Sequence, residues 1–209
     1  MINIVSGQQF LLCGESFGIK GEMISFNEAM IDGQPNEIIF SQDFIEERCR
    51  THNVSVEEYN KITLFLLDKI KNHSSLRMYF GFDMFCQINM LTLLAYFDQI
   101  NFYPEIELYI CDEINLNVVD TFKISAMNYY SLYDQIIVKK KKITTANKYL
   151  DKVIDYYFDY DRKDSKVIKE MLKDCATTDR HEQLCYLITR DTQYGLGDTQ
   201  WSKWLDILQ

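Results

Sequence analysis

An apolar segment, Leu76 to Phe82, leads through Asp83 into a second apolar segment, Met84 to Phe97. The first has the length and composition of a buried strand, and the second is long enough for a buried helix. An aspartate at the start of a helix accepts hydrogen bonds from the free backbone N–H groups there. The junction therefore predicts a carboxylate at the carboxyl end of a buried strand, where open α/β sheets bind their ligands.

Further strands and helices alternate along the first half of the chain. Short apolar runs at residues 2–5, 21–26 and 106–111 read as three more strands. Two helices are expected between the run at residues 21–26 and the segment at residues 76–82, and Ser41 and Ser55 are suited to be their N-caps. The expected apolar face of the second helix consists of Val56, Tyr59, Ile62, Leu66 and Ile70. This alternation predicts an α/β fold with a mostly parallel sheet and flanking helices.

The pattern becomes helical after about residue 117. We therefore expect an α/β domain over residues 1–117, the candidate ligand-binding domain, and a small all-helical unit over residues 118–209. In the second part, only residues 136–138 resemble a strand, and four lysines follow at 139–142, as on a protected edge strand. Thr145 is expected to cap a long helix. A final helix is expected to carry Trp201, Trp204 and Leu208.

Charge and cysteine usage narrow the class of protein. The net charge is -9, and the acidic excess lies in the first 117 residues, so nucleic-acid binding is disfavoured. The six cysteines form no Cys-x-x-Cys pair, and no basic region precedes the first apolar segment. We expect reduced thiols, no secretion signal, no membrane span and a cytoplasmic location.

The carboxyl ends of parallel strands share one edge of a sheet, and the acidic residues of the first half follow such ends. Asp83 and Asp112 could there hold Mg²⁺, which prefers oxygen ligands, and Asp83 is the candidate catalytic base. Arg48 offers a positive partner for an anionic ligand. The other expected ligand-binding residues are Ser6, Gly7, Asp32 and Gln87. Each also has a purely structural explanation as a helix cap, a turn residue or a solvated charge.

Four segments resemble the bacterial family called domain of unknown function 1835. They are residues 4–7 (Ile-Val-Ser-Gly), residues 21–24 with the turn at 32–35, residues 80–87, and the turn at 195–200. The third is similar to an aromatic-x-x-Asp-x-aromatic-x-Gln element, which makes Asp83 and Gln87 the residues that carry over. In the first segment Gln8-Gln9 replaces the family's Asp-Ser. The resemblance implies the fold and no defined activity.

Two classes of function fit the sequence. In the first, the strand ends bind a small molecule, such as a nucleotide or a sugar phosphate, with Mg²⁺. In the second, the helical C-terminal unit makes regulatory or scaffolding contacts with a protein partner or a second copy. The turn at Gly195-Leu196 resembles that of a helix-turn-helix. DNA reading is disfavoured because Lys203 is the one basic side chain on the helix that follows.

Overall fold

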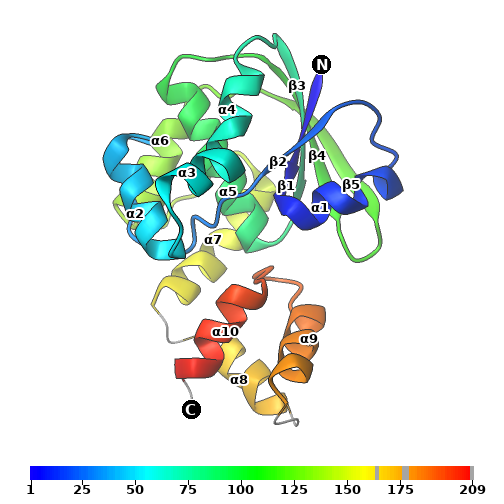
Figure 1. Cartoon of the computed structure of the whole chain (residues 1–209), viewed down its shortest axis with the longest axis vertical. Helices are drawn as coiled ribbons and strands as arrows, with labels where there is room; N and C mark the ends of the chain where they lie inside the picture. The colour runs from blue at the N-terminus through cyan, green and yellow to red at the C-terminus, as the bar shows by residue number, and fades with distance from the viewer. Residues whose placement is uncertain (163–164, 176–178, 208–209) are drawn as a thin grey trace.

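The computed structural model describes residues 1–162, 165–175 and 179–207 and contains one five-stranded sheet. The strand order is β2-β1-β3-β4-β5, and β5 runs antiparallel to β4 while the other neighbours are parallel (Figure 1). The predicted α/β class with a mostly parallel sheet is confirmed. The strands are β1 (Ile2–Ser6), β2 (Met23–Phe26), β3 (Ser75–Gly81), β4 (Glu105–Asp112) and β5 (Asn117–Ile124).

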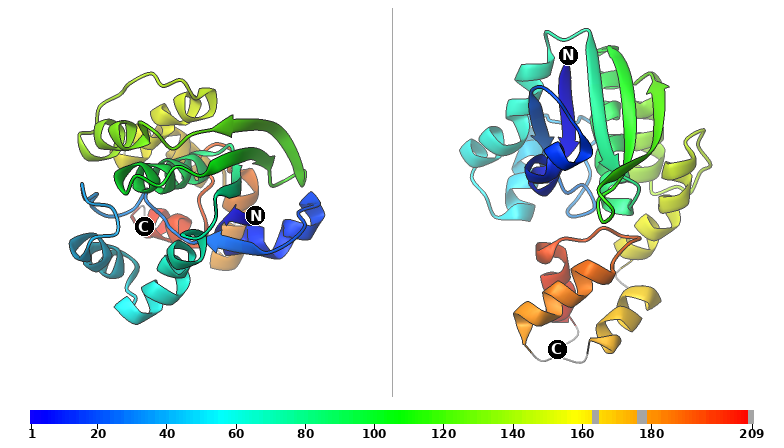
Figure 2. Two further views of the ribbon diagram at one scale, coloured as in Figure 1. Left: turned by 90° about the horizontal axis from the view of Figure 1, so that it is seen from above. Right: turned by 90° about the vertical axis from the view of Figure 1, so that its right-hand side faces the viewer.

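Helices cover the two faces of the sheet unequally. The short α1 (Gly7–Cys13) and the 3-10 turn η1 (Gly14–Phe17) lie on one side of the sheet, against β1 and β2, and helices α2 to α7 lie on the other side (Figure 2). Those before β4 are α2 (Gln42–His52), α3 (Val56–Tyr59), α4 (Phe65–Ile70) and α5 (Met84–Gln99). After β5 come α6 (Tyr129–Tyr133) and α7 (Lys148–Asp161), followed by α8 (Lys166–Asp174), α9 (Arg180–Arg190) and α10 (Asp198–Ile207), which do not cover the sheet.

Helix α5 is the centre of the molecule. One side packs on the sheet through Met90, Leu93 and Leu94, and the other side packs on α6 and α7 through Ile88 and Leu91. All five of these side chains are fully buried. Apolar residues occur on every side of the helix between Met84 and Phe97, and the helix has neighbours on every side. The burial predicted from the sequence is therefore confirmed.

Beyond residue 117 the sequence prediction is wrong in two places. Residues 117–124 form β5, which extends the sheet instead of beginning a helical unit. Ile136 and Ile137 are buried in a π-helical turn, η3 (Asp134–Val138), and not in a strand. Three of the four lysines that follow pair with Asp134, Asp161 and Asp155, so the run is a neutralised surface and not a strand edge.

Helix caps are predicted more accurately than helix faces. The hydroxyl of Ser41 accepts from Phe44 N, and that of Ser55 accepts from Glu58 N. The π-helical turn η2 (Asn60–Leu64) then shifts the register of the following helix, so Thr63 is buried while Ile62 is exposed. The cap of α7 is Asn147, whose side chain accepts from Tyr149 N and Leu150 N, and not Thr145.

The C-terminal helices α8–α10 form a smaller unit beneath the sheet (Figure 1). Trp201 and Trp204 are 0% and 3% exposed, so both belong to its core and neither is an exposed anchor for a partner. Leu208 lies outside the described residues. Within the described ranges, we find no helix that combines the length and the hydropathy needed to span a bilayer.

Candidate functional site

The sheet has its switch point between β1 and β3. The chain passes from β1 to β2 on one side and later places β3 on the other side of β1. In open α/β sheets, ligands bind in the crevice that such a reversal leaves at the carboxyl ends of the strands. Here Ser6 ends β1 and Asp83 follows β3, so both residues lie at this crevice.

Asp83 is held in place as the N-cap of α5. Its backbone is extended, and its Oδ1 accepts a hydrogen bond of 2.8 Å from Cys86 N. This is the role that the sequence indicates for an aspartate between a strand and a helix. This capping hydrogen bond fixes the direction of the carboxylate. An aspartate in a loop without such a bond would not have a fixed direction.

Three side chains with metal-binding or acid–base chemistry meet at this cap. Cys86 lies one turn into α5, and its Sγ is 3.1 Å from Ser6 Oγ and 3.5 Å from Glu113 Oε1. Ligand atoms of Asp83, Cys86 and Glu113 all lie within 4.8 Å of one another. The cluster therefore joins the ends of β1, β3 and β4.

Gly81 keeps the centre of this cluster open. A Cβ at this position would lie 2.4 Å from Asp83 Oδ2, 3.0 Å from Cys86 Sγ and 3.1 Å from Glu113 Oε1. A side chain at residue 81 would therefore force Asp83 Oδ2 to move and would crowd Cys86 Sγ and Glu113 Oε1. The glycine at the end of β3 leaves room for these three groups to meet.

Burial shifts the protonation of every member of the cluster. It raises the pKa of Asp83 to about 6, although the N–H of Cys86 opposes the shift. Glu113 is an exposed residue, and partial desolvation of its carboxyl together with the charge of Asp83 raises its pKa. Burial and the two carboxylates also raise the pKa of Cys86 well above its usual range, so its sulfur is a thiol at neutral pH. The two carboxyl groups can therefore give and take protons near neutrality.

The raised pKa of Asp83 has a consequence for stability. The folded protein holds this proton more tightly than the unfolded chain, whose pKa is near the ordinary 3.8. The stabilising contribution is complete below about pH 4 and is lost as the pH rises through about 6. At neutral pH the ionised carboxylate is therefore a source of instability that a positive ligand would relieve.

A loop of the C-terminal unit forms the opposite wall. The carbonyl oxygens of Gln193 and Tyr194 accept hydrogen bonds of 2.9 Å from Met84 N and Phe85 N in the first turn of α5. Asp191 shapes this loop, because its carboxylate accepts from Tyr194 N and Leu196 N at 2.8 Å. Gly195 lies directly against Asp83, since a Cβ on it would be 2.1 Å from Asp83 Oδ1.

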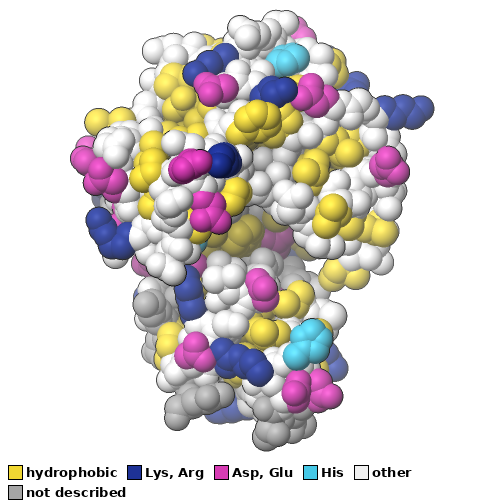
Figure 3. Space-filling model, viewed as in Figure 1, with side chains coloured by type: hydrophobic (Ala, Val, Ile, Leu, Met, Phe, Trp, Pro, Cys, Tyr) yellow, Lys and Arg dark blue, Asp and Glu magenta, His cyan; other side chains and the backbone are white. Residues whose placement is uncertain are grey.

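These elements enclose a cavity of about 320 Å³. Polar and acidic groups at the strand ends line one side, and the rest of the lining mixes polar residues, such as Gln8 and Thr192, with apolar ones from both parts of the chain. In the space-filling view, the surface is hollowed between the α/β body and the C-terminal helices (Figure 3). The candidate site is thus built by both halves of the chain. The sequence-predicted residues that line it are Ser6, Gly7, Asp83 and Asp112.

Two of the residues predicted to contribute here have structural roles. Asp112 accepts from Ile114 N, Asn115 N and Asn115 Nδ2, and so shapes the turn between β4 and β5. Its neighbour Glu113, and not Asp112, joins the cluster with Asp83. Gln87 is fully buried and does not line the cavity; its Nε2 donates to Gly81 O at 2.6 Å.

Asp32 and Arg48 lie away from the cavity, which corrects the prediction that they share the site. Asp32 accepts from Lys203 at 2.8 Å, from Gln200 at 3.1 Å and from Tyr160 at 2.9 Å, and so fastens α10 to the α/β body. These three donors lower its pKa against the effect of burial. Asp32 therefore links two parts of the fold and lies outside the lining of the cavity.

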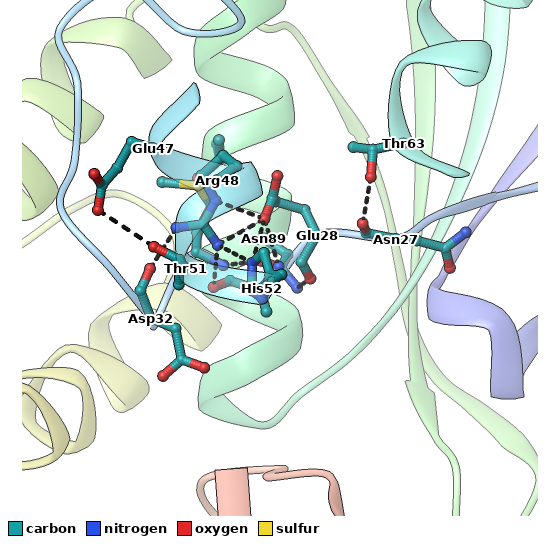
Figure 4. A network of polar contacts seen from close by, with 12 residues as sticks. Asn27, Glu28, Asp32, Glu47, Arg48, Thr51, His52, Thr63 and Asn89 are labelled. Carbon is teal, nitrogen blue, oxygen red and sulfur yellow. Dashed lines mark hydrogen bonds and ion pairs between the residues drawn. The ribbon is translucent and has the colours of Figure 1, made fainter. Parts of the chain in front are cut away.

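Arg48 is the centre of a buried ionic network (Figure 4). It is 1% exposed, and its Nη2 lies 2.7 Å from Glu28 Oε1, from Ala29 O and from His52 Nε2. Glu28 also accepts from the hydroxyl of Tyr59. Burial alone would raise the pKa of Glu28, but these partners lower it to about 2. The network fixes the loop after β2 against α2.

The sequence does not indicate that the loop at residues 191–197 lies against the strand ends of the candidate site. Asp191 and Gly195 reach Asp83 only because the C-terminal unit folds back on α5, a contact between residues more than 100 positions apart. The turn at residue 195 resembles part of a helix-turn-helix in sequence, but in the structure it covers the start of α5.

Comparison of the chain with protein-family models, with curated proteins and with solved structures gives no match. The resemblance to the domain of unknown function 1835 stays a prediction.

Proposed function

We propose that this chain binds a small polar ligand or a cation in the cavity at the carboxyl ends of β1 and β3. The observation that carries the proposal is the meeting of Asp83, Cys86 and Glu113 around Gly81. Their carboxyl groups have raised pKa values near neutrality, a feature that clusters at functional sites. Asp83 would act as the proton acceptor, and Glu113 as its partner.

The donor set also fits a divalent cation. Two carboxylates and one thiol within 4.8 Å suit Zn²⁺ better than the Mg²⁺ expected from the sequence, because Mg²⁺ takes oxygen ligands while sulfur favours softer ions. A bound cation would supply Lewis-acid chemistry and favour the thiolate form of Cys86. A nucleotide or other phosphate ligand would need such a cation, since the described residues that line the cavity include carboxylates and no basic side chain.

A thermal-shift screen tests the proposal. The wild-type chain would be heated with ZnCl₂, MnCl₂ or MgCl₂, and with nucleotides and small polar metabolites in the presence and absence of Mg²⁺. A ligand at 100 times its Kd stabilises the folded state by about 2.7 kcal/mol, which raises Tm by roughly 5–10 °C for a chain of this size.

Asp83→Asn is expected to remove this shift, because it deletes the charge while asparagine still caps the helix. A matched control is Asp68→Asn, which removes the same charge from a side chain of α4 that is 80% exposed. The control should keep the wild-type shift. If no compound raises the Tm of the wild type, or if Asp83→Asn responds equally, the proposal is wrong.

A further inference from the structure

A groove of about 580 Å³ runs beside the helical segment that α3, η2 and α4 form together (Figure 1). Phe40 and Tyr96 form one side of the groove, and their rings meet edge to face at 4.9 Å. Residues of the helical segment that recur every three or four positions form the other side, so they share one face of the helix. They include Glu57, Lys61, Leu64, Phe65, Asp68 and Lys71.

The centre of this helical face is apolar and lies in solvent. Phe65 is 52% exposed, whereas Leu67, which also lines the groove, is buried. In the space-filling view, hydrophobic side chains lie over α3 and α4 with charges of both signs beside them (Figure 3). An aromatic side chain with charged neighbours, next to a groove with an aromatic wall, has the composition of a protein contact surface.

The charges of the helical face are ordered so that the face is complementary to a second copy of itself. From the N-terminal end, the order is Glu57, Lys61, the apolar centre, Asp68 and Lys71. An antiparallel copy would place its Lys71 opposite Glu57 and its Asp68 opposite Lys61, with Phe65 near the two-fold axis. A two-fold axis repeats each contact, as in isologous interfaces. A parallel copy would instead bring like charges together, which disfavours association.

The ion pairs within the chain are compatible with these contacts. Glu57 pairs with Lys61 and Asp68 with Lys71, both at 2.7 Å, and the four side chains are 60–80% exposed. Pairs that are this exposed contribute little to stability. Each pair can persist in the dimer, where two acidic and two basic side chains would gather at each end of the contact.

We infer that this face is the contact surface of a homodimer, in which the helical segments of residues 56–70 pack antiparallel and Phe65 of each copy enters the groove of the other beside Phe40 and Tyr96. One helical face and one groove from each copy make a small interface, so the dimer should exchange readily with the monomer. The inference is independent of the proposed function, because no residue that lines the groove lines the cavity.

Sedimentation velocity of the full chain tests this inference. We expect a dissociation constant on the order of 10 µM, so that the wild type is mostly monomeric at about 1 µM and mostly dimeric at about 200 µM. Glu57→Lys and Lys71→Glu should each raise this constant roughly tenfold or more, because each variant places like charges together on both sides of the axis. An equimolar mixture of the two variants should associate within about threefold of the wild type, because every charge in the heterodimer again faces the opposite sign.

Two pairs of variants complete the test. Phe65→Ser should weaken association roughly tenfold or more, whereas Leu12→Ser, at an apolar residue of α1 that is 73% exposed, should change it less than about twofold. Glu15→Lys is the matched control for Glu57→Lys, since Glu15 is exposed in η1 on the other side of the sheet. It should also leave the dissociation constant within about twofold of the wild type.

A wild type that stays monomeric at about 200 µM would overturn the inference, whether or not a ligand binds in the cavity. A dimer that Glu57→Lys and Phe65→Ser leave unchanged would overturn it too, because the contact would then lie on another face. The same holds if the two charge variants are weakened singly but their mixture does not recover, since the antiparallel pairing of Glu57 with Lys71 would then be wrong.

Discussion

Replacing Arg48 with methionine is expected to lower the free energy of unfolding by about 3–5 kcal/mol, since removal of one partner of a buried ion pair leaves the other charge uncompensated. Glu28 would then remain buried with its ionised carboxylate, and its remaining partners would be Ala29 N, the Tyr59 hydroxyl and the His52 ring. The carbonyl oxygens of Ala29 and Asp32 would lose their donor as well. Urea unfolding at pH 7 measures the change.

The matched control is Arg50→Met, in the same helix. Arg50 is 73% exposed and pairs with Glu47, so its replacement should change the free energy of unfolding by less than about 1 kcal/mol. The double variant Arg48→Met with Glu28→Gln should recover part of the loss, because the uncompensated charge is then removed too. A loss below 1 kcal/mol for Arg48→Met alone would show that the network is open to water.

Gly195→Ala is expected to open the candidate site and to lower the free energy of unfolding by about 2–5 kcal/mol. The residue has φ +67°, a conformation that costs a non-glycine residue roughly 1–2 kcal/mol. Its new Cβ would also lie 2.1 Å from Asp83 Oδ1 and 2.4 Å from Asp83 Cγ, and relieving such overpacking typically costs about 1–3 kcal/mol more. Because Asp83 is fixed as a helix cap, the loop has to move.

The movement should break the hydrogen bonds from Met84 N and Phe85 N to the loop and should abolish ligand-induced stabilisation. Gly18→Ala is the control: its φ is +70°, yet nothing lies within 4 Å of the added Cβ. It should lose only about 1–2 kcal/mol and keep the ligand response. Amide hydrogen exchange at residues 84 and 85 reports the loop directly. Equal behaviour of the two alanine variants would refute the close contact between Gly195 and Asp83.

The local features of the fold were accessible from the sequence. Asp83 could be predicted as a cap at the end of a buried strand, because one residue accounts for both the end of β3 and the start of α5. The burial of α5 on all sides follows from its composition in the same way. Such features depend on neighbours within a few positions, where propensity and capping act directly.

Features that depend on tertiary contacts were not accessible. β5 has exposed valines and charged residues, since it is an edge strand with half of its backbone in solvent, and it therefore lacks the apolar run of a buried strand. From the sequence, Arg48 is expected to be a surface residue of a polar helix. It is buried because folding places Glu28 and Tyr59 around it. Asp112 and Glu113 are adjacent in sequence, and only the geometry of the turn decides that Glu113 faces Asp83.

The central claim is that Asp83 and Glu113 form a pair of carboxyl groups whose ionisation is opposed by their surroundings. Carbon-13 NMR titration of the two side-chain carboxyls in the unliganded protein measures this directly. We expect a pKa of about 6 for Asp83 and a raised pKa, below about 7, for Glu113, because solvent around its exposed side chain reduces the shift. If both groups titrate near their ordinary values of 3.8 and 4.5, the cavity is open to water and the proposed site is contradicted.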